Sequence, residues 1–288
     1  MNYSPIYLCG KLFKGGFLDF SMAKTIGILS LKGGVGKTSS VVSLGTALSE
    51  FGKRVLLVDA NFSAPNLGIH LNLINPQKHL HDVMDDKINP SDAVYEIGNL
   101  DVLPANIFSK GITNPMNLRN KLRHLKRSYD YILIDSSPAL NEETLAAMIA
   151  SDLIFIVTTP DYSTLSMTLK AIKIAKQRGT QIDGIILNRV YNKDFELSLK
   201  DIENTSEVPV LAVIPHDINV LKAQSKFISL LEQSPKSEAS EEYRKLAASI
   251  SGEKYKPVKV RNFFRWIVPK KQDINRTIYY KQIFDESR

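Results

Sequence analysis

The sequence contains one cysteine, one tryptophan and no long hydrophobic run. A lone thiol, Cys9, cannot close an internal disulfide or form a metal site of several cysteines, so we expect a reducing compartment, the cytoplasm. No apolar stretch approaches the roughly 20 residues that span a bilayer. Residues 1–22 lack the basic start and compact apolar core of a signal peptide. We therefore expect them to form an N-terminal extension that does not pack on the domain.

The charge is distributed unevenly along the chain. The formal net charge is +7, and residues 254–288 contain ten Lys or Arg and three Asp or Glu, which accounts for all of the excess. The preceding residues carry equal numbers of each sign. A neutral domain with a basic tail predicts a localised contact with an anionic surface. It argues against nucleic-acid binding by the domain itself, since a DNA-binding domain is expected to have basic residues on its folded surface.

The hydrophobic pattern predicts an α/β fold. With 43% apolar residues in 288, the chain can bury one main core. Short β-branched runs, apolar on both faces, alternate with helical patterns, which predicts an open, mostly parallel sheet of about seven strands with helices on both faces. The expected strands lie at 25–29, 55–59, near 100, 131–135, 153–159, 184–190 and 210–215, and the expected helices at 37–50, 115–128, 142–150, 164–178 and from about 234. We expect a domain at 23–252, a tail at 253–288, and ligands at the carboxyl ends of the strands.

A glycine-rich loop, 31-LKGGVGKTSS-40, connects the first expected strand to the first expected helix. Its glycines allow successive backbone N–H groups to turn towards a phosphate, and the helix that follows presents its positive end. A lysine in this position can reach the β- and γ-phosphates, and the hydroxyl after it can bind Mg²⁺. The pattern predicts ATP and Mg²⁺ as cofactors, with the nucleotide held by Lys32, Gly33, Gly34, Val35, Gly36, Lys37, Thr38 and Ser39.

The loop departs from the standard phosphate-binding pattern, because Leu31 occupies the first glycine position and Lys32 precedes the glycine pair. The sequence K-G-G-x-G-K-T resembles the deviant Walker A motif of the MinD/ParA family. The resemblance extends over residues 24–250, through VLLVDAN, YDYILIDSSPAL, ILNRV and VIPHD, and DANFSAPNLGIHL with RNFFRWIVPKKQ is similar to a subgroup of archaeal MinD-like ATPases. In this family the early lysine reaches the phosphates of a partner subunit. The resemblance therefore implies a homodimer that forms when ATP is bound.

The resemblance also implies roles for particular residues. Thr38, Asp135 and Asp59 are the expected magnesium ligands, with Asp135 at a strand end where it can hold a metal-bound water. Lys32, Lys37, Asp59 and Asn61 are the expected catalytic residues. The segments ILNRV and VIPHD correspond to the family's adenine contacts, which nominates Asn188, Pro215 and Asp217.

Asn61 is the main departure from the family. Most relatives have an aspartate at this position, two residues after Asp59, which orients or deprotonates the attacking water. An amide can hold a water but cannot accept its proton. A lost general base costs roughly 10²- to 10⁴-fold in rate, although orientation alone can suffice in phosphoryl transfer. We therefore expect slow hydrolysis, while a neutral exchange in which Asp59 takes the role remains an alternative.

The tail contains an amphipathic segment that is framed by basic residues. Its aromatic and apolar side chains fall at helical spacing, and such a segment resembles in kind the carboxy-terminal membrane-targeting helix of MinD. The segment consists of Arg261, Phe263, Phe264, Arg265, Trp266, Ile267, Lys270 and Lys271. It can bind the inner face of the cell membrane, pack on the domain or bind nucleic acid, and residues after Asn275 are a candidate docking site for an unidentified protein.

The leading hypothesis is a slow ATPase that dimerises with ATP and controls the position of a partner or complex in the cell. The alternatives are a nucleotide-binding scaffold with negligible turnover and a DNA-partitioning ATPase. A related tyrosine kinase would need a tyrosine-rich tail, and Tyr279 and Tyr280 are too few to favour it.

Overall fold

The computed structural model describes residues 22–109, 112, 114–180, 182–255 and 270–284. They form an eight-stranded sheet with the order β3-β4-β2-β5-β1-β6-β7-β8, in which every neighbouring pair is parallel except β3 with β4. The strands are β1 (Lys24–Leu29), β2 (Val55–Ala60), β3 (Tyr95–Ile97), β4 (Leu100–Leu103), β5 (Tyr131–Ser136), β6 (Leu153–Thr158), β7 (Gly184–Val190) and β8 (Val210–Pro215). The predicted fold class is confirmed.

Burial explains which strands were predictable from the sequence. Every residue of β2 and β5 is buried, because helices cover both faces of the sheet, and such strands appear in the sequence as continuous apolar runs. The edge strand β3 has three residues, none of them fully buried. It therefore has no apolar run, and the sequence analysis missed it.

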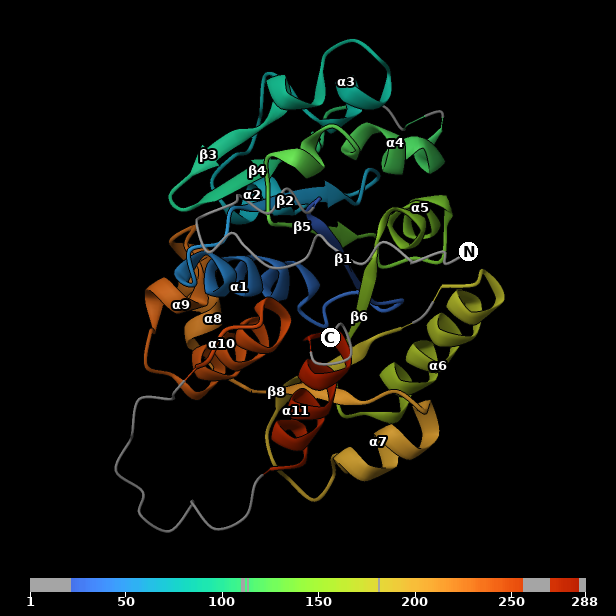
Figure 1. Ribbon diagram of the computed structural model, residues 1–288, viewed down its shortest axis with the longest axis vertical. Helices are drawn as coiled ribbons and strands as arrows, with labels where there is room; N and C mark the ends of the chain where they lie inside the picture. The colour runs from blue at the N-terminus through green and yellow to red at the C-terminus, as the bar shows by residue number, and fades with distance from the viewer. Residues whose placement is uncertain (1–21, 110–111, 113, 181, 256–269, 285–288) are drawn as a thin grey trace, which may run out of the picture.

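The helices form one layer on each face of the sheet (Figure 1). One layer contains α3 (Leu80–Met84), α4 (Leu118–Leu122), α5 (Glu142–Ala150), α6 (Tyr162–Gln177) and α7 (Leu199–Ser206). The other contains α1 (Lys37–Glu50), α2 (Leu67–His70), α9 (Leu230–Gln233), α10 (Glu238–Ser251) and α11 (Lys271–Phe284), with α8 (Asn219–Ser225) beside α9. Short 3₁₀ turns η1 (Pro90–Ala93), η2 (Pro115–Asn117) and η3 (Leu125–Arg127) complete the elements.

The helices predicted at 37–50 and 142–150 have the expected bounds, and the others differ. The helix α1 has the predicted bounds, and Asn141 caps α5 by accepting a hydrogen bond from the Thr144 N–H. The helix α6 begins at Tyr162, two residues earlier than predicted, because Asp161 is its N-cap. The single helix predicted at 115–128 is wrong. That stretch divides into η2, α4 and η3. Within it, the Asn120 side-chain amide donates a hydrogen bond to the Asn117 side-chain oxygen at 2.8 Å.

The helix α11 packs on the domain, although the sequence analysis placed its residues in the tail. Arg276, only 4% exposed, donates to the Leu211 carbonyl at 2.8 Å and forms an ion pair with Glu242 at 2.9 Å. The Tyr279 ring packs edge-on against Phe155. Lys271 forms an ion pair with Glu203. The aromatic segment of the tail, residues 261–267, lies outside the described residues.

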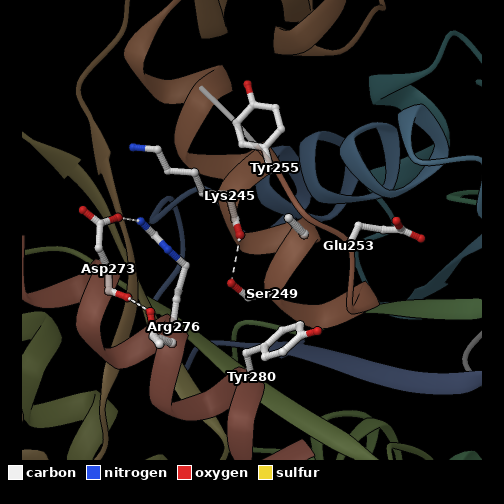
Figure 2. Close-up of a pocket in the computed structure, with 9 residues that line it drawn as sticks. Lys245, Ser249, Glu253, Tyr255, Asp273, Arg276 and Tyr280 are labelled. Carbon is white, nitrogen blue, oxygen red and sulfur yellow. Dashed lines mark hydrogen bonds and ion pairs between the residues drawn. The ribbon is translucent and has the colours of Figure 1, made fainter. Parts of the chain in front are cut away.

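A pocket of about 450 Å³ lies between α10 and α11 (Figure 2). Lys245 and Ser249 line it from α10, and Asp273, Arg276 and Tyr280 line it from α11. Its cations Lys245 and Arg276 are already neutralised, since Lys245 forms an ion pair with Glu242 and Arg276 forms ion pairs with both Glu242 and Asp273. The pocket contains no residue of the glycine-rich loop.

None of the helices that the structure describes combines the length and the apolar character needed to cross a bilayer.

Candidate nucleotide site

The glycine-rich loop lies between the carboxyl end of β1 and the start of α1. Gly34 and Gly36 have φ angles of 76° and 97°, a left-handed conformation that favours glycine. The Asn188 side chain, from β7, donates to the Val35 carbonyl at 2.8 Å and lies so close that a Cβ on Gly36 would clash with its amide nitrogen. Both the backbone conformation and this contact therefore require glycine at position 36.

Lys37, Thr38 and Asp135 meet at the ends of β1 and β5. The Thr38 hydroxyl donates to one Asp135 oxygen at 2.6 Å, and the other Asp135 oxygen is buried with no hydrogen-bond partner among the described residues. Burial lowers the pKa of Lys37, and the charge of Asp135 partly opposes this effect. A hydroxyl beside a carboxylate with a free oxygen suits Mg²⁺, which usually binds to one or two carboxylates together with substrate phosphates.

A magnesium ion at Thr38 and Asp135 would need further ligands from a bound phosphate. In the described part of the chain, no group of three or more His, Cys, Asp or Glu residues could hold a metal ion. Thr38 and Asp135 fit the predicted metal site. Asp59 does not present a free oxygen there. One of its oxygens accepts from the Asn61 N–H at 3.2 Å, and the other accepts from the Asn66 and Leu67 N–H groups, both at 3.0 Å.

Asp59 and Asp135 are register partners on adjacent strands, and both are buried. Burial raises the pKa of each carboxyl group, and the charge of Asp135 adds to the effect on Asp59. Two buried acids side by side disfavour double ionisation. The three backbone N–H groups that donate to Asp59 oppose this rise in its pKa without cancelling it, and they hold the loop after β2 in place.

Asn61 lies in that loop with 5% exposure. Its side-chain N–H donates to the Ala64 carbonyl, while its side-chain oxygen is buried without a partner among the described residues. Two residues further, the Ser63 hydroxyl donates to Glu143 of α5, whose second carboxylate oxygen is also buried and unpartnered there. The sequence analysis missed Glu143. Its only sequence signal was an acid in the first turn of the helix that follows Asp135.

Lys32 contacts the start of α6 within its own subunit. Its ammonium group donates to the Thr164 hydroxyl at 2.8 Å, the Ser163 hydroxyl at 3.3 Å and the Asp161 carboxylate at 3.4 Å. The Lys32 side chain remains 39% exposed, so the contact is accessible to solvent.

The three residues nominated for adenine lie at the ends of two adjacent strands. Asn188 is in β7, Pro215 ends β8, and Asp217 follows β8 and accepts from the Asn219 backbone and side chain at 2.8 Å. β7 pairs with β8 near Pro215. Ser39, at the loop end of α1, accepts from Gln224 of α8 at 2.9 Å, a contact that sequence reasoning did not predict.

A buried histidine connects two loops at this end of the sheet. The Asn106 N–H donates to Nδ1 of His81 at 3.3 Å, so Nε2 carries the proton and donates to the Phe62 carbonyl at 3.3 Å. His81 is 4% exposed. Burial, followed by the neighbouring His79, lowers the pKa of His81 below its usual 6.5. The neutral imidazole therefore links the segment after Asn61 to the loop after β4.

A strand, a glycine-rich turn and a helix that carry Lys37 and Thr38, with Asp135 on the adjacent strand, define a P-loop nucleotide-binding protein. A family model described as an AAA domain matches residues 23–183. An uncharacterized ATP-binding protein of Methanocaldococcus jannaschii is 37% identical over 81% of this chain and 90% of its own length. The septum site-determining protein MinD of Thermotoga maritima is 30% identical, with coverages of 81% and 90%.

Solved structures agree with these matches. The cell division ATPase MinD of Pyrococcus furiosus superposes with a TM-score of 0.74 at 32% identity, covering 80% of this chain and 99% of the other. The septum site-determining protein MinD of Pyrococcus horikoshii, complexed with Mg-ADP, gives 0.73 at 31% identity, with coverages of 80% and 96%. The chain belongs to the MinD/ParA family of P-loop ATPases.

The His81 link predicts a specific pH dependence of stability. A histidine whose pKa is depressed by folding stabilises the protein fully above pH 6.5, and this contribution is lost as the pH falls through and below 6.5, because only the unfolded chain takes up the proton. The loss is about 1.4 kcal/mol for each unit between the two pKa values. The free energy of unfolding in urea should fall less between pH 7.5 and pH 5.5 in His81→Gln than in the unchanged protein. The control is His124→Gln at an exposed histidine, which should show the same fall as the unchanged protein. If the free energy of unfolding fell equally in His81→Gln and in the unchanged protein, the role of His81 would be refuted.

Proposed function

We propose that this protein is an ATP-dependent switch that dimerises when Mg-ATP is bound, hydrolyses ATP slowly and thereby controls the position of a partner or complex in the cell. The observation that carries the proposal is Lys32, an additional lysine at the start of a complete phosphate loop. A lysine supplied across a dimer interacts more strongly with the larger charge of ATP than with that of ADP. The nucleotide state then determines the oligomeric state.

The residues at the site have the chemistry to bind Mg-ATP. The N–H groups of the loop and the start of α1 would surround the phosphates, and Lys37 would neutralise their charge. Thr38 and Asp135 would hold Mg²⁺, which supplies charge stabilisation for phosphoryl transfer when bound. The Mg-ADP complex of the related Pyrococcus horikoshii protein supports this assignment. Asn188, Pro215 and Asp217 would contact adenine, although the amide of Asn188 also braces the loop.

The surface around the site supports a dimer that closes over the carboxyl end of the sheet. Each connection that follows β4, β5, β6, β7 and β8 exposes a large apolar side chain. They are Phe108 (73% exposed), Leu140 (43%), Tyr162 (79%), Phe195 (75%) and Ile218 (54%). Exposed apolar groups gathered at one end of a fold are typical of an interaction surface.

Lys32 would change partners during this cycle. In the single subunit it interacts with Asp161, Ser163 and Thr164 of the same chain. These contacts are partly exposed, so they are weak enough to be exchanged for the phosphates of a second subunit. Dimerisation therefore requires this lysine to leave α6.

Asn61 supports a slow turnover. Its unpartnered oxygen can accept a hydrogen bond from a water, but the amide cannot take the water's proton. If the absence of a carboxylate at position 61 abolished ATP hydrolysis, the protein would act as a nucleotide-binding scaffold that docks partners without measurable turnover. The two functions differ in whether phosphate is released at all.

The positioning role rests on the relatives that determine a septum site, and the basic tail is the proposed contact with an anionic membrane or with a protein partner. A DNA-partitioning role is less well supported, because the charge of residues 1–253 sums to zero. We propose the cytoplasm as the location, with the tail as the attachment to the inner face of the cell membrane.

The substitution Asn61→Asp should accelerate ATP hydrolysis by roughly tenfold or more, because it restores a carboxylate that can orient and deprotonate the attacking water. The rate of phosphate release at saturating Mg-ATP measures this directly. Lys37→Ala provides the inactive control. The scaffold function would replace the switch if the unchanged protein binds ATP but releases no phosphate, and an unaltered rate in Asn61→Asp would disprove the role given to Asn61.

Membrane attachment can be followed through Trp266, the only tryptophan of the chain. Adding anionic liposomes should shift its fluorescence to shorter wavelength and pellet the protein, more strongly with ATP than with ADP, because two tails act together in a dimer. A variant with Phe263, Phe264 and Ile267 changed to Ser retains the fluorophore and should remain in the supernatant. Equal behaviour of both proteins, or no pelleting in either nucleotide, would contradict membrane attachment by this segment.

A further inference from the structure

Glu143 is a buried acid near the nucleotide site, and only one of its carboxylate oxygens has a hydrogen-bond partner in the part of the chain that the structure describes. The residue is 8% exposed, and one carboxylate oxygen accepts from the Ser63 hydroxyl. The other oxygen is buried without a partner among the described residues. Leaving a buried charged oxygen unpaired costs free energy, and such groups are concentrated at functional sites.

The position of Glu143 connects it with the two segments that contain the expected magnesium ligand Asp135 and the expected catalytic residue Asn61. It lies in the first turn of α5, directly after the segment that begins at Asp135, and its Ser63 contact ties it to the loop that carries Asn61. These segments follow β5 and β2, which are adjacent in the sheet. The unpartnered oxygens of Asn61, Asp135 and Glu143 therefore belong to one end of the sheet.

The unpartnered oxygens of Asn61 and Glu143 favour a ligand that donates hydrogen bonds, such as water. Amide and carboxylate oxygens that lack partners can each accept a hydrogen bond from water, and a water held between them would be oriented by the amide and deprotonated by a carboxylate. Asp59 is less available as the base, because its two oxygens already accept three backbone N–H groups, whereas one Glu143 oxygen accepts none among the described residues. Asp135 has its free oxygen beside Thr38, where it suits the metal.

We propose that Glu143 is the carboxylate that accepts the proton of the attacking water in this protein, in place of an acid at position 61. This inference rests on the proposed ATPase function and identifies its general base. Asn61 orients the water, and Ser63 fixes the orientation of the Glu143 carboxyl group.

The proposed hydrolysis exchanges one phosphorus–oxygen bond for another. The water oxygen forms a bond to the γ-phosphorus while the bond from that phosphorus to the β–γ bridging oxygen breaks, and the electron pair of that bond stays on ADP. One proton of the water passes to the free oxygen of Glu143. Glu143 then releases this proton to solvent, so ADP, phosphate and a proton are formed and the carboxylate is restored.

Glu143→Gln tests the proposal, because glutamine keeps an oxygen to accept the Ser63 hydrogen bond but cannot accept a proton. Single-turnover phosphate release from full-length protein with Mg-ATP should fall by roughly 100-fold or more. ATP affinity and urea unfolding should be unchanged. The pH dependence of the single-turnover rate should lose its acid limb in this variant. The exposed neighbour Glu142, changed to Gln, is the matched control and should retain the rate of the unchanged protein.

Adding Glu143→Gln to the Asn61→Asp variant shows whether Glu143 acts as a base or only supports the structure. If the carboxylate introduced at position 61 supplies a second base, adding Glu143→Gln should reduce the rate by less than roughly tenfold, a non-additive result. Ser63→Ala removes the orienting hydrogen bond but leaves the carboxylate, so it should retain the acid limb and lose less activity than Glu143→Gln.

Two results would overturn the inference while the proposed function stands. The first is a Glu143→Gln rate equal to that of the unchanged protein. The second is an equal loss in both backgrounds together with weakened ATP binding, which would show that Glu143 only supports the loop. By contrast, ATP binding without any phosphate release by the unchanged protein would overturn the proposed ATPase switch, and the role of Glu143 with it.

Discussion

The burial of Asp59 and Asp135 on adjacent strands is the constraint on which the rest of the site depends. Taking two carboxylates out of water is costly unless each finds donors. Three backbone N–H groups satisfy Asp59, and this requirement folds the segment after β2 back over the strand end. Within the described part of the chain, Asp135 has only the Thr38 hydroxyl as a donor and Lys37 as a neighbouring positive charge, so one oxygen is left for a ligand.

The same arrangement links nucleotide binding to the surface of the domain. Asn188 holds the phosphate loop from β7, His81 connects Phe62 to Asn106, and Lys32 lies on the start of α6. Each contact joins the site to a connection that also exposes a large apolar side chain. A ligand that binds one arrangement of these loops better than another shifts the population by its difference in affinity. These are the contacts that the proposed nucleotide-dependent change of partner would use.

Local patterns were predictable from the sequence, and tertiary contacts were not. The strand β1 was predictable from its buried apolar run, and the start of α1 from the glycine-rich loop that precedes it. The lysine and threonine of that loop indicate that it binds phosphate. The strand β3 was missed because it is short and half-exposed. The Ser63–Glu143 bond, the His81 link and the contact of Lys32 with α6 join residues far apart in sequence, and no local periodicity encodes them. The docking of α11 was left open for a similar reason, since its buried Arg276 depends on Glu242 and on the Leu211 carbonyl.

The proposed switch requires ATP, acting through Lys32, to change the oligomeric state of the protein. The most direct test is the molar mass in solution, measured by light scattering after size-exclusion chromatography, with Mg-ATP and with Mg-ADP. We expect a dimer with ATP and a monomer with ADP for the unchanged protein. Lys32→Ala should still bind ATP and should be a monomer with either nucleotide. The same mass in both nucleotides, or an ATP-dependent dimer of Lys32→Ala, would contradict the proposed switch.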